Sequence, residues 1–288
     1  MIIKYTNSIN ESIVLNKAKI KLREADFFHF RWDMESTGRR YVAIKKPKEY
    51  LVRIEIIGNS KEKKDMLDIF SKITEKDALS NTKGKLYIDD QYIECFVVEG
   101  NSKPSESPIG INKEIRIFAP CPFWIQELTK QFLPQTTVNA TRGLNYPFDY
   151  PFNYAPSKVG LATWEIDHYT SSHFLMRIYG PCVDPKVFIN NYPYQVFTTL
   201  EAGDYLEIDT RNNTVIKYLA NGTTQNCYNS RQFTPSIFEK IPPGSLTFSW
   251  PGNFGFDMTV FIERSEPKWD TSEKYYIVDE SGKYIITE

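Results

Sequence analysis

The middle of the chain reads Asn145-Tyr146-Pro147-Phe148-Asp149-Tyr150-Pro151-Phe152-Asn153-Tyr154 and repeats an aromatic-Pro-aromatic unit. Each proline lacks a backbone N–H and fixes φ, so the segment predicts neither a helix nor a central strand. We therefore expect residues 134–156 to form an extended strap between two folded domains. Its rings are too apolar for a plain flexible linker and are candidates for packing between domains or between subunits, the alternative being a loop whose rings fill local gaps. These candidates are Tyr146, Phe148, Tyr150, Phe152 and Tyr154.

Upstream of the strap, residues 1–133 predict strands around one helix. Asn59 is a suitable N-cap residue, and Glu62 follows three positions later as its partner in a capping box. The apolar residues after this start recur at helical spacing and predict a stripe that faces the core. That stripe consists of Met66, Leu67, Ile69, Phe70 and Ile73.

The rest of this first domain is typical of β-structure. The segments 41–44 and 50–57 have the composition of strands. Residues 84–98 predict a hairpin that turns at Asp89-Asp90. A polar loop is expected over 100–110, followed by a strand over 114–118.

Residues 157–269 contain no helical pattern and predict a β-sandwich or jelly roll. Asparagine tolerates positive φ, so Asn190-Asn191 and Asn212-Asn213 mark the turns of two hairpins. Two late strands are expected over 245–250 and 256–264. Residues 270–288 form a C-terminal tail that could close as one more hairpin around Ser281-Gly282. The fold class expected for the whole chain is therefore mainly β.

Composition excludes several classes of protein. Of the 288 residues, 41% are hydrophobic, which is enough to form packed cores. The 15% that are aromatic favour β-strands. The net charge of −1 does not indicate nucleic-acid binding. The start of the chain lacks the apolar core of a signal peptide, and no run is long enough for a membrane span, so we expect synthesis in the cytoplasm without membrane insertion. The four cysteines have no CxxC spacing and are expected as buried free thiols.

A search for chemistry identifies no catalytic constellation. Asp167, His168 and His173 are a weak metal candidate, because positions 168 and 173 of a strand face opposite sides. The sequence contains no nucleophile elbow and no phosphate-binding loop. Trp164 and Trp250 could stack on a sugar ring, with burial in the core as the alternative. We therefore predict that the chain has no catalytic, cofactor or metal site and is not an enzyme.

Four segments, taken in order along the chain, resemble one known family. They are Ala119–Trp124, Gly180–Pro185, Leu200–Arg211 and Phe238–Arg264. The family is that of the distal tail proteins of siphophages and related prophages, especially those with Gram-positive hosts. The resemblance extends over residues 20–269, and the strap lies where such proteins join their two domains.

The resemblance implies a split-barrel-type domain over 1–133 that forms a ring, and a galectin-like β-sandwich over 157–269. It also implies a ring of six subunits at the distal end of the virion tail. Such a ring contacts the tail tube protein on one side and tail-tip or receptor-binding proteins on the other. The alternative is a carbohydrate-binding module that recognises host cell-wall saccharide through Trp164 or Trp250.

Overall fold

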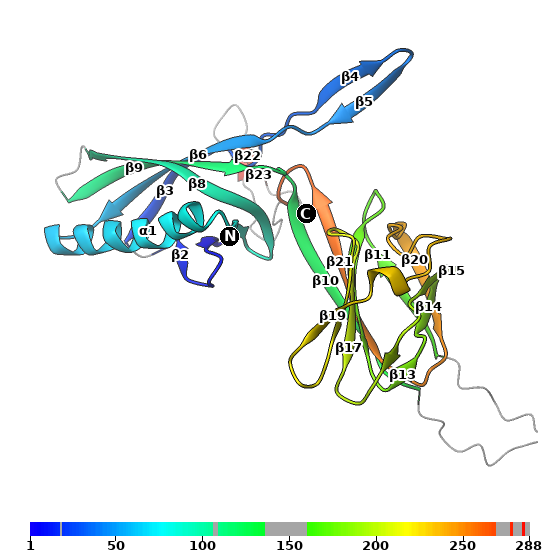
Figure 1. Cartoon of the computed structure of the whole chain (residues 1–288). Helices are drawn as coiled ribbons and strands as arrows, with labels where there is room; N and C mark the ends of the chain where they lie inside the picture. The colour runs from blue at the N-terminus through cyan, green and yellow to red at the C-terminus, as the bar shows by residue number, and fades with distance from the viewer. Residues whose placement is uncertain (18, 106–108, 136–159, 269–276, 279–283, 286–288) are drawn as a thin grey trace, which may run out of the picture. The chain divides into compact units, whose positions relative to one another are not determined.

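The chain forms two compact units in the computed structural model, which describes residues 1–17, 19–105, 109–135, 160–268, 277–278 and 284–285. The first unit combines Met1–Gln126 with Glu263–Glu288, and the second is Glu127–Ile262. Strands dominate both units, and the described residues contain a single α-helix (Figure 1). The mainly β fold class predicted from the sequence is therefore confirmed.

The first unit is built around one long strand, β8, that belongs to two sets of paired strands. Its first half lies in the order β2-β1-β7-β8, and its second half lies in the order β8-β9-β6-β3. A register shift between Val97 and Glu99 separates the two halves, as expected for a bulge that bends a strand. The elements are β1 (Ile3–Thr6), β2 (Ser12–Val14), β3 (Ile20–Ala25), β4 (Asp33–Thr37), β5 (Arg40–Ile44), β6 (Lys48–Ile57), α1 (Ser60–Ser80), β7 (Gly84–Ile88), β8 (Gln91–Pro104), β9 (Gly110–Ala119), the start of β10 (Trp124–Phe132), β22 (Ile277–Val278) and β23 (Tyr284–Ile285).

The helix α1 begins as the sequence predicted. Asn59 accepts a hydrogen bond from the backbone N–H of Glu62, and the Glu62 side chain accepts one from the backbone N–H of Asn59. Phe70 and Ile73 are buried on the side of the helix that packs on the sheet. Ile69 is half-exposed, so its place in the predicted stripe was wrong. Successive residues of an α-helix point in different directions around its axis. Phe70 therefore faces the core, and its neighbour Ile69 faces away from it.

A buried polar network fastens the end of α1 to β1. The Tyr5 hydroxyl donates to Asp77 Oδ2 at 2.5 Å, and the backbone N–H and hydroxyl of Ser8 donate to Asp77 Oδ1 at 2.9 and 2.7 Å. Burial raises the pKa of the Tyr5 hydroxyl, and the hydrogen bond to Asp77 raises it further. Gly84 lies so close to this pair that a Cβ at position 84 would stand only 2.3 Å from the Tyr5 hydroxyl. Among the described residues, Asp77 thus receives hydrogen bonds from Tyr5 and Ser8 and forms no ion pair.

Three aromatic rings pack against one another in the core of the first unit. Trp124, the last residue of one family-like segment, is fully buried. Its ring meets Phe27 and Tyr50 edge-on, with centroids 5.9 and 6.3 Å apart. Such edge contacts stabilise a core beyond simple burial.

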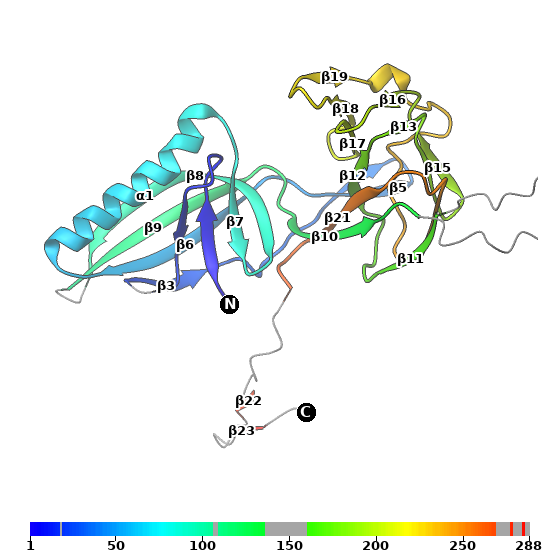
Figure 2. The ribbon, with the colours of Figure 1, turned by 90° about the horizontal axis from the view of Figure 1, so that it is seen from below.

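The second unit contains two facing sets of strands. One has the order β19-β18-β17-β12-β21-β10, and the other has the order β11-β20-β14-β15 (Figure 2). The hairpins predicted at Asn190-Asn191 and Asn212-Asn213 are both present, with positive φ at Asn190, Asn191 and Asn213. The elements are β11 (Gly160–Ile166), β12 (His173–Tyr179), β13 (Cys182–Val183), β14 (Lys186–Ile189), β15 (Tyr192–Gln195), β16 (Thr199–Leu200), β17 (Tyr205–Asp209), β18 (Thr214–Tyr218), β19 (Thr224–Asn226), η1 (Tyr228–Ser230), β20 (Gly244–Trp250) and β21 (Phe256–Arg264).

Aromatic rings from both sets fill the core of the second unit. Phe132 on β10 stacks on Phe256 at 4.4 Å and contacts Phe248 on β20 at 4.5 Å. A buried ion pair lies at the start of the β17–β18 hairpin, where Lys217 Nζ stands 3.0 Å from Asp204 Oδ2 and also donates to the Thr199 carbonyl. The hydrogen bond from Lys217 holds the pKa of Asp204 below its usual value.

Some expectations about chain organisation differ from the structure. Residues 100–104 continue β8 instead of forming a loop, because they pair with β9 up to Pro104. Cys121 is exposed, whereas the cysteines at 95, 182 and 227 are buried as expected. The predicted order of domains was linear, but Glu263–Glu288 group with the first unit. In the tail, β22 pairs antiparallel with β23 on either side of the turn expected at Ser281-Gly282.

Candidate assembly surfaces

The strap lies outside the described residues. This applies to all five rings that the sequence marked as packing candidates, Tyr146, Phe148, Tyr150, Phe152 and Tyr154. Their role therefore stays a prediction. The surfaces described below are formed by the described residues, and each belongs to one of the two units.

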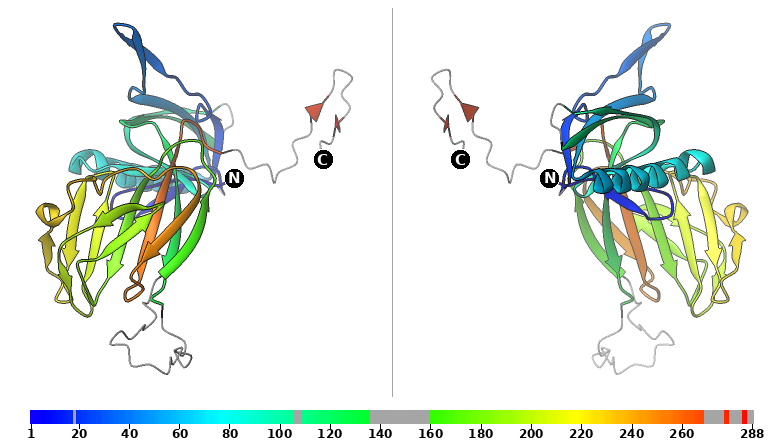
Figure 3. Two further views of the ribbon diagram at one scale, coloured as in Figure 1. Left: turned by 90° about the vertical axis from the view of Figure 1, so that its right-hand side faces the viewer. Right: turned by 90° about the vertical axis from the view of Figure 1, so that its left-hand side faces the viewer.

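The hairpin β4–β5 of the first unit exposes several apolar side chains. Figures 1 and 3 show it extending away from the sheet from which it emerges. Among the described strands, β4 and β5 pair only with each other. The exposed fractions of Met34, Tyr41 and Val42 are 62%, 73% and 50%.

The register of this hairpin places apolar side chains on both of its faces. Met34 lies opposite Ala43, and Tyr41 lies two positions away on the same face. Val42 lies on the other face, opposite Glu35. An isolated two-stranded hairpin is at best marginally stable in water. A hairpin with two apolar faces and two open edges is therefore a surface suited to another protein.

The base of the hairpin is held by an aromatic-lysine cluster. Lys45 Nζ lies 4.7 Å from the ring centroid of Phe123 and 5.2 Å from that of Trp32, and it donates to the Ser265 carbonyl at 3.3 Å. The Trp32 and Phe123 rings meet edge-on at 6.0 Å. Burial lowers the pKa of Lys45 to about 8, with the charge of Lys48 acting in the same direction and that of Glu266 opposing it. The cluster thus fixes both ends of the hairpin to neighbouring segments of the same unit.

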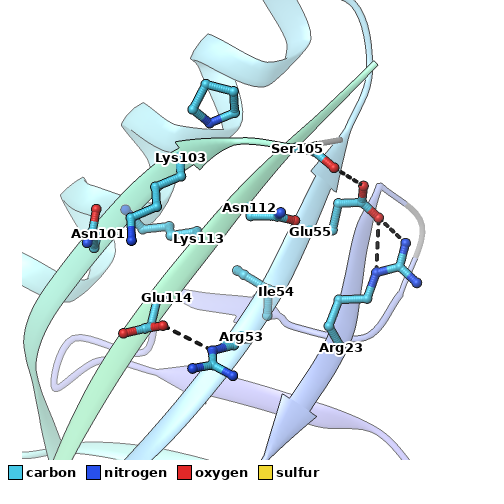
Figure 4. A pocket seen from close by; sticks show the side chains of 11 residues that line it. Arg23, Arg53, Ile54, Glu55, Asn101, Lys103, Ser105, Asn112, Lys113 and Glu114 are labelled. Atoms are coloured by element: carbon cyan, nitrogen blue, oxygen red, sulfur yellow. Dashed lines mark hydrogen bonds and ion pairs between the residues drawn. The ribbon is translucent and has the colours of Figure 1, made fainter. Parts of the chain in front are cut away.

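The outer face of the sheet formed by β3, β6, β9 and β8 contains a shallow cavity of about 550 Å³ (Figure 4). Arg53 Nε contacts Glu114 at 3.0 Å, and Arg53 also pairs with Glu24. Arg23 pairs with the buried carboxylate of Glu55, which also accepts from the Ser105 hydroxyl at 2.8 Å.

Hydrogen bonds from Arg23 and then Ser105 lower the pKa of Glu55. Both arginines of the cavity are thus neutralised within the unit. Among the described residues that line the cavity, no arginine therefore remains unpaired to bind an anion.

The two tryptophans proposed for saccharide stacking lie in different surroundings. Trp250 is 3% exposed, and its indole N–H donates to the Phe254 carbonyl at 3.0 Å. The backbone of Gly160 covers its ring, since a Cβ at 160 would stand 2.2 Å from the indole. Trp250 therefore presents no open face for a sugar. Trp164 is only partly buried, so stacking at Trp164 stays a prediction.

A smaller cavity of about 330 Å³ lies at one end of the second unit, beside Phe132, Pro134 and Phe254. The Tyr179 hydroxyl donates to Asp257 Oδ2 at 2.7 Å at its edge. Burial raises the pKa of Tyr179 to about 12, and Asp257 contributes to this rise. This tyrosine is therefore a neutral hydrogen-bond donor at neutral pH.

The described part of the chain contains no group of three or more His, Cys, Asp and Glu side chains arranged to hold a metal ion. Within the same residues, no helix is long and apolar enough to cross a membrane. Asp167, His168 and His173 are therefore not brought together as a metal site.

No family model and no curated protein matches the chain. Solved structures do match it, and hub and baseplate proteins of phages are among them. One is the SPP1 Dit protein, presented as a paradigm of the hub adsorption apparatus in phages that infect Gram-positive bacteria. Its TM-score is 0.55 at 6% identity, over 92% of this chain and 100% of that chain.

Another is a chain of the phage P2 baseplate in its activated conformation with Ca, with a TM-score of 0.55 at 14% identity, over 92% of this chain and 99% of that chain. The same baseplate with Sr matches with the same values. At these identities the likeness establishes the fold. The chain therefore has the fold of phage hub proteins, and this fold extends over most of its length.

Proposed function

We propose that this chain is a structural hub protein at the distal end of a phage or prophage tail, of the type found in siphophages of Gram-positive hosts, and that it is not an enzyme. The observation that carries the proposal is the fold likeness over 92% of this chain and the whole of SPP1 Dit. The order of the family-like segments supports it independently, because those segments were selected from the sequence alone.

In this proposal six copies of the first unit close into a ring. A ring needs two different surfaces on each subunit that meet head to tail. The β4–β5 hairpin is our candidate for one of them, since Met34, Tyr41 and Val42 are exposed on its two faces. The strap over 134–156 remains a second candidate, with Tyr150 and Phe152 as the residues whose replacement by Ser would loosen the packing.

The ring would join the tail tube protein to the tail-tip and receptor-binding proteins. The second unit, a β-sandwich, would project its loops towards those tail-tip proteins. Saccharide recognition by the sandwich is the alternative, and Trp164 is the residue that remains for it, because Trp250 is buried. Binding of purified host cell wall by the wild type, lost in Trp164→Ala, would favour that alternative.

Negative-stain electron microscopy of the purified protein tests the ring directly. Closed particles with six-fold symmetry and a central channel are expected. Two variants test whether the β4–β5 hairpin makes the contact between subunits. The double variant Tyr41→Ser with Val42→Ser removes apolar surface from the hairpin. The control Leu161→Ser removes a similarly exposed side chain from the second unit. Rings should be lost in the first variant and kept in the second. The proposal fails if the protein remains monomeric both alone and in the presence of a tail tube protein.

A further inference from the structure

The second unit carries an exposed cluster of aromatic rings around one arginine, which we call the aromatic-arginine patch: Tyr228, Arg231, Phe233 and Phe238. The guanidinium carbon of Arg231 lies 3.6, 4.2 and 5.5 Å from the ring centroids of Tyr228, Phe233 and Phe238. The Tyr228 and Phe238 rings are nearly parallel, with 5.9 Å between centroids. Phe233 is 60% exposed and Tyr228 is 38% exposed.

The backbone that carries the patch is fixed although it contains little regular structure. The Phe197 N–H donates to the Ser230 carbonyl at 2.7 Å, and the Gln232 N–H donates to the Gln195 carbonyl at 2.9 Å. The side chains of Cys227 and Ile237, which precede Tyr228 and Phe238 in the chain, are buried in the core. Figure 2 draws the η1 turn, where the patch begins, as the short coil of the second unit. A surface that is already ordered loses little entropy when a partner binds.

Arg231 differs from Arg177 and Arg53 in having no ionic partner among the described residues. Arg177 in the same unit pairs with Glu207 at 2.8 Å, and Arg53 pairs with two glutamates. The hydrogen bond that Arg231 makes goes instead from Nη1 to the Tyr228 carbonyl at 2.5 Å. The surrounding rings shield the guanidinium from water on its faces. A carboxylate that approached its free edge would form a charge-assisted hydrogen bond in an apolar surrounding.

We propose that the aromatic-arginine patch binds a segment of another tail protein in which an Asp or Glu is flanked by apolar side chains. The carboxylate would pair with Arg231, and the apolar neighbours would cover Phe233 and Tyr228. Tyrosine and arginine are enriched among the residues that dominate protein interfaces. A neutral sugar stacked on the outer faces of these rings would leave the charge of Arg231 without an ionic partner, whereas a carboxylate would pair with it. The choice of a tail protein as the source of this segment rests on the hub function proposed above.

Selection from a displayed library of random peptides, with the immobilised full-length chain as the target, tests this inference. The wild type should enrich peptides with an acidic residue beside aromatic or aliphatic ones. A synthetic peptide of the enriched sequence should then bind Arg231→Gln and Phe233→Ser at least about tenfold more weakly, the effect of losing about 1.4 kcal/mol of interaction. Arg177→Gln is the matched control, since it removes an exposed arginine of the same unit, and it should bind the peptide like the wild type.

Three outcomes would overturn the inference. The first is enrichment of peptides without an acidic residue, and the second is equal peptide binding by Arg231→Gln at an unchanged melting temperature. The third is that polygalacturonate binds at the patch while no peptide does. Ring formation is read separately by electron microscopy, with and without a tail tube protein: peptide binding without rings in either condition would reject the hub and leave the patch as a protein-binding site. Rings formed without peptide binding would reject the patch alone.

Discussion

Two hairpins of this chain share a local design and differ in their surroundings. The β14–β15 hairpin turns at Asn190-Asn191, both with positive φ, and β4–β5 turns through Gly38, also with positive φ. Val187 and Tyr194 of the first hairpin are buried, and β14 also pairs with β20. The apolar side chains of the second hairpin face solvent in the isolated chain.

The turn residues determine whether a hairpin forms. The packing around it determines whether its apolar side chains are buried in its own unit or remain available to another protein. The β14–β15 hairpin buries its apolar side chains in its own core. The β4–β5 hairpin keeps comparable side chains without a core to receive them, and a hairpin alone is marginally stable. This contrast makes the exposed hairpin the stronger candidate for intermolecular contact.

Removing a ring from the packed hairpin should have the largest effect on stability. Tyr194→Ala deletes a buried ring that meets Phe174 edge-on at 5.2 Å and a hydroxyl that donates to the Glu239 carbonyl. We expect a loss of about 3–5 kcal/mol in the free energy of unfolding of the second unit, measured by urea denaturation. Tyr41→Ala in the exposed hairpin should change the free energy of unfolding of the first unit, to which this hairpin belongs, by less than about 0.5 kcal/mol. Equal losses in the two variants would remove the contrast.

Removing apolar surface from the exposed hairpin should act on assembly. Tyr41→Ser with Val42→Ser should weaken subunit association by about 2–4 kcal/mol, typical of central interface residues, without lowering the melting temperature of the monomer. Sedimentation velocity over a range of concentrations measures this. Association that is unchanged in the double variant would show that the ring contact lies elsewhere, with the strap as the next candidate.

The lysine at the base of the exposed hairpin should make stability depend on pH. The pKa of Lys45 is lowered to about 8 in the folded chain, below its value of about 10.4 in an unfolded chain. Between these values the unfolded state binds more protons, so the stability of the first unit should rise as pH increases through 8. Lys45→Met should flatten this rise. Melting temperatures at about pH 7.5 and 9.5 measure it, and an equal rise in wild type and variant would contradict the assignment.

The turns should show the smallest effects. Gly38 has a φ of +65° and open space around its Cα, so Gly38→Ala adds about 1 kcal/mol of backbone strain and no clash. Because few packing contacts depend on β4–β5, we expect faster amide hydrogen exchange in the hairpin and an unchanged global melting temperature. Asn190→Ala is the counterpart in the packed hairpin, where the side chain also accepts from the Thr247 N–H at 2.8 Å, and it should lower the melting temperature. A lower melting temperature for Gly38→Ala would show that β4–β5 supports the core.

The sequence predicted elements whose signals are local. The capping box at Asn59 and the asparagine turns at 190 and 213 depend on neighbouring residues only, and they are confirmed. It did not predict β4, because Met34, Glu35 and Ser36 have no core of their own to create an alternating pattern. It also missed the end of β8, where polar residues pair with β9 through backbone hydrogen bonds that place no demand on side chains.

The candidate sites were harder to predict, because a surface site depends on which distant residues the fold brings together. The strap was conspicuous because proline and aromatic residues stand out in a sequence, and it lies outside the described residues. The aromatic-arginine patch depends on how Phe238 returns beside Tyr228, ten positions earlier, which only the fold reveals. Trp250 illustrates the opposite case, since a residue type common in sugar sites is here part of the core.

The division of the chain has a consequence for the order of folding. The second unit is inserted within the first, whose later part begins at Glu263. The Ser265 carbonyl accepts from Lys45, and the Lys268 N–H donates to the Gln91 side chain at 2.9 Å, so the first unit needs residues made after the whole second unit. During synthesis the second unit can fold while the first is still incomplete. If the first unit forms the ring, assembly is thereby delayed until the second unit and residues 265–268 have been synthesised.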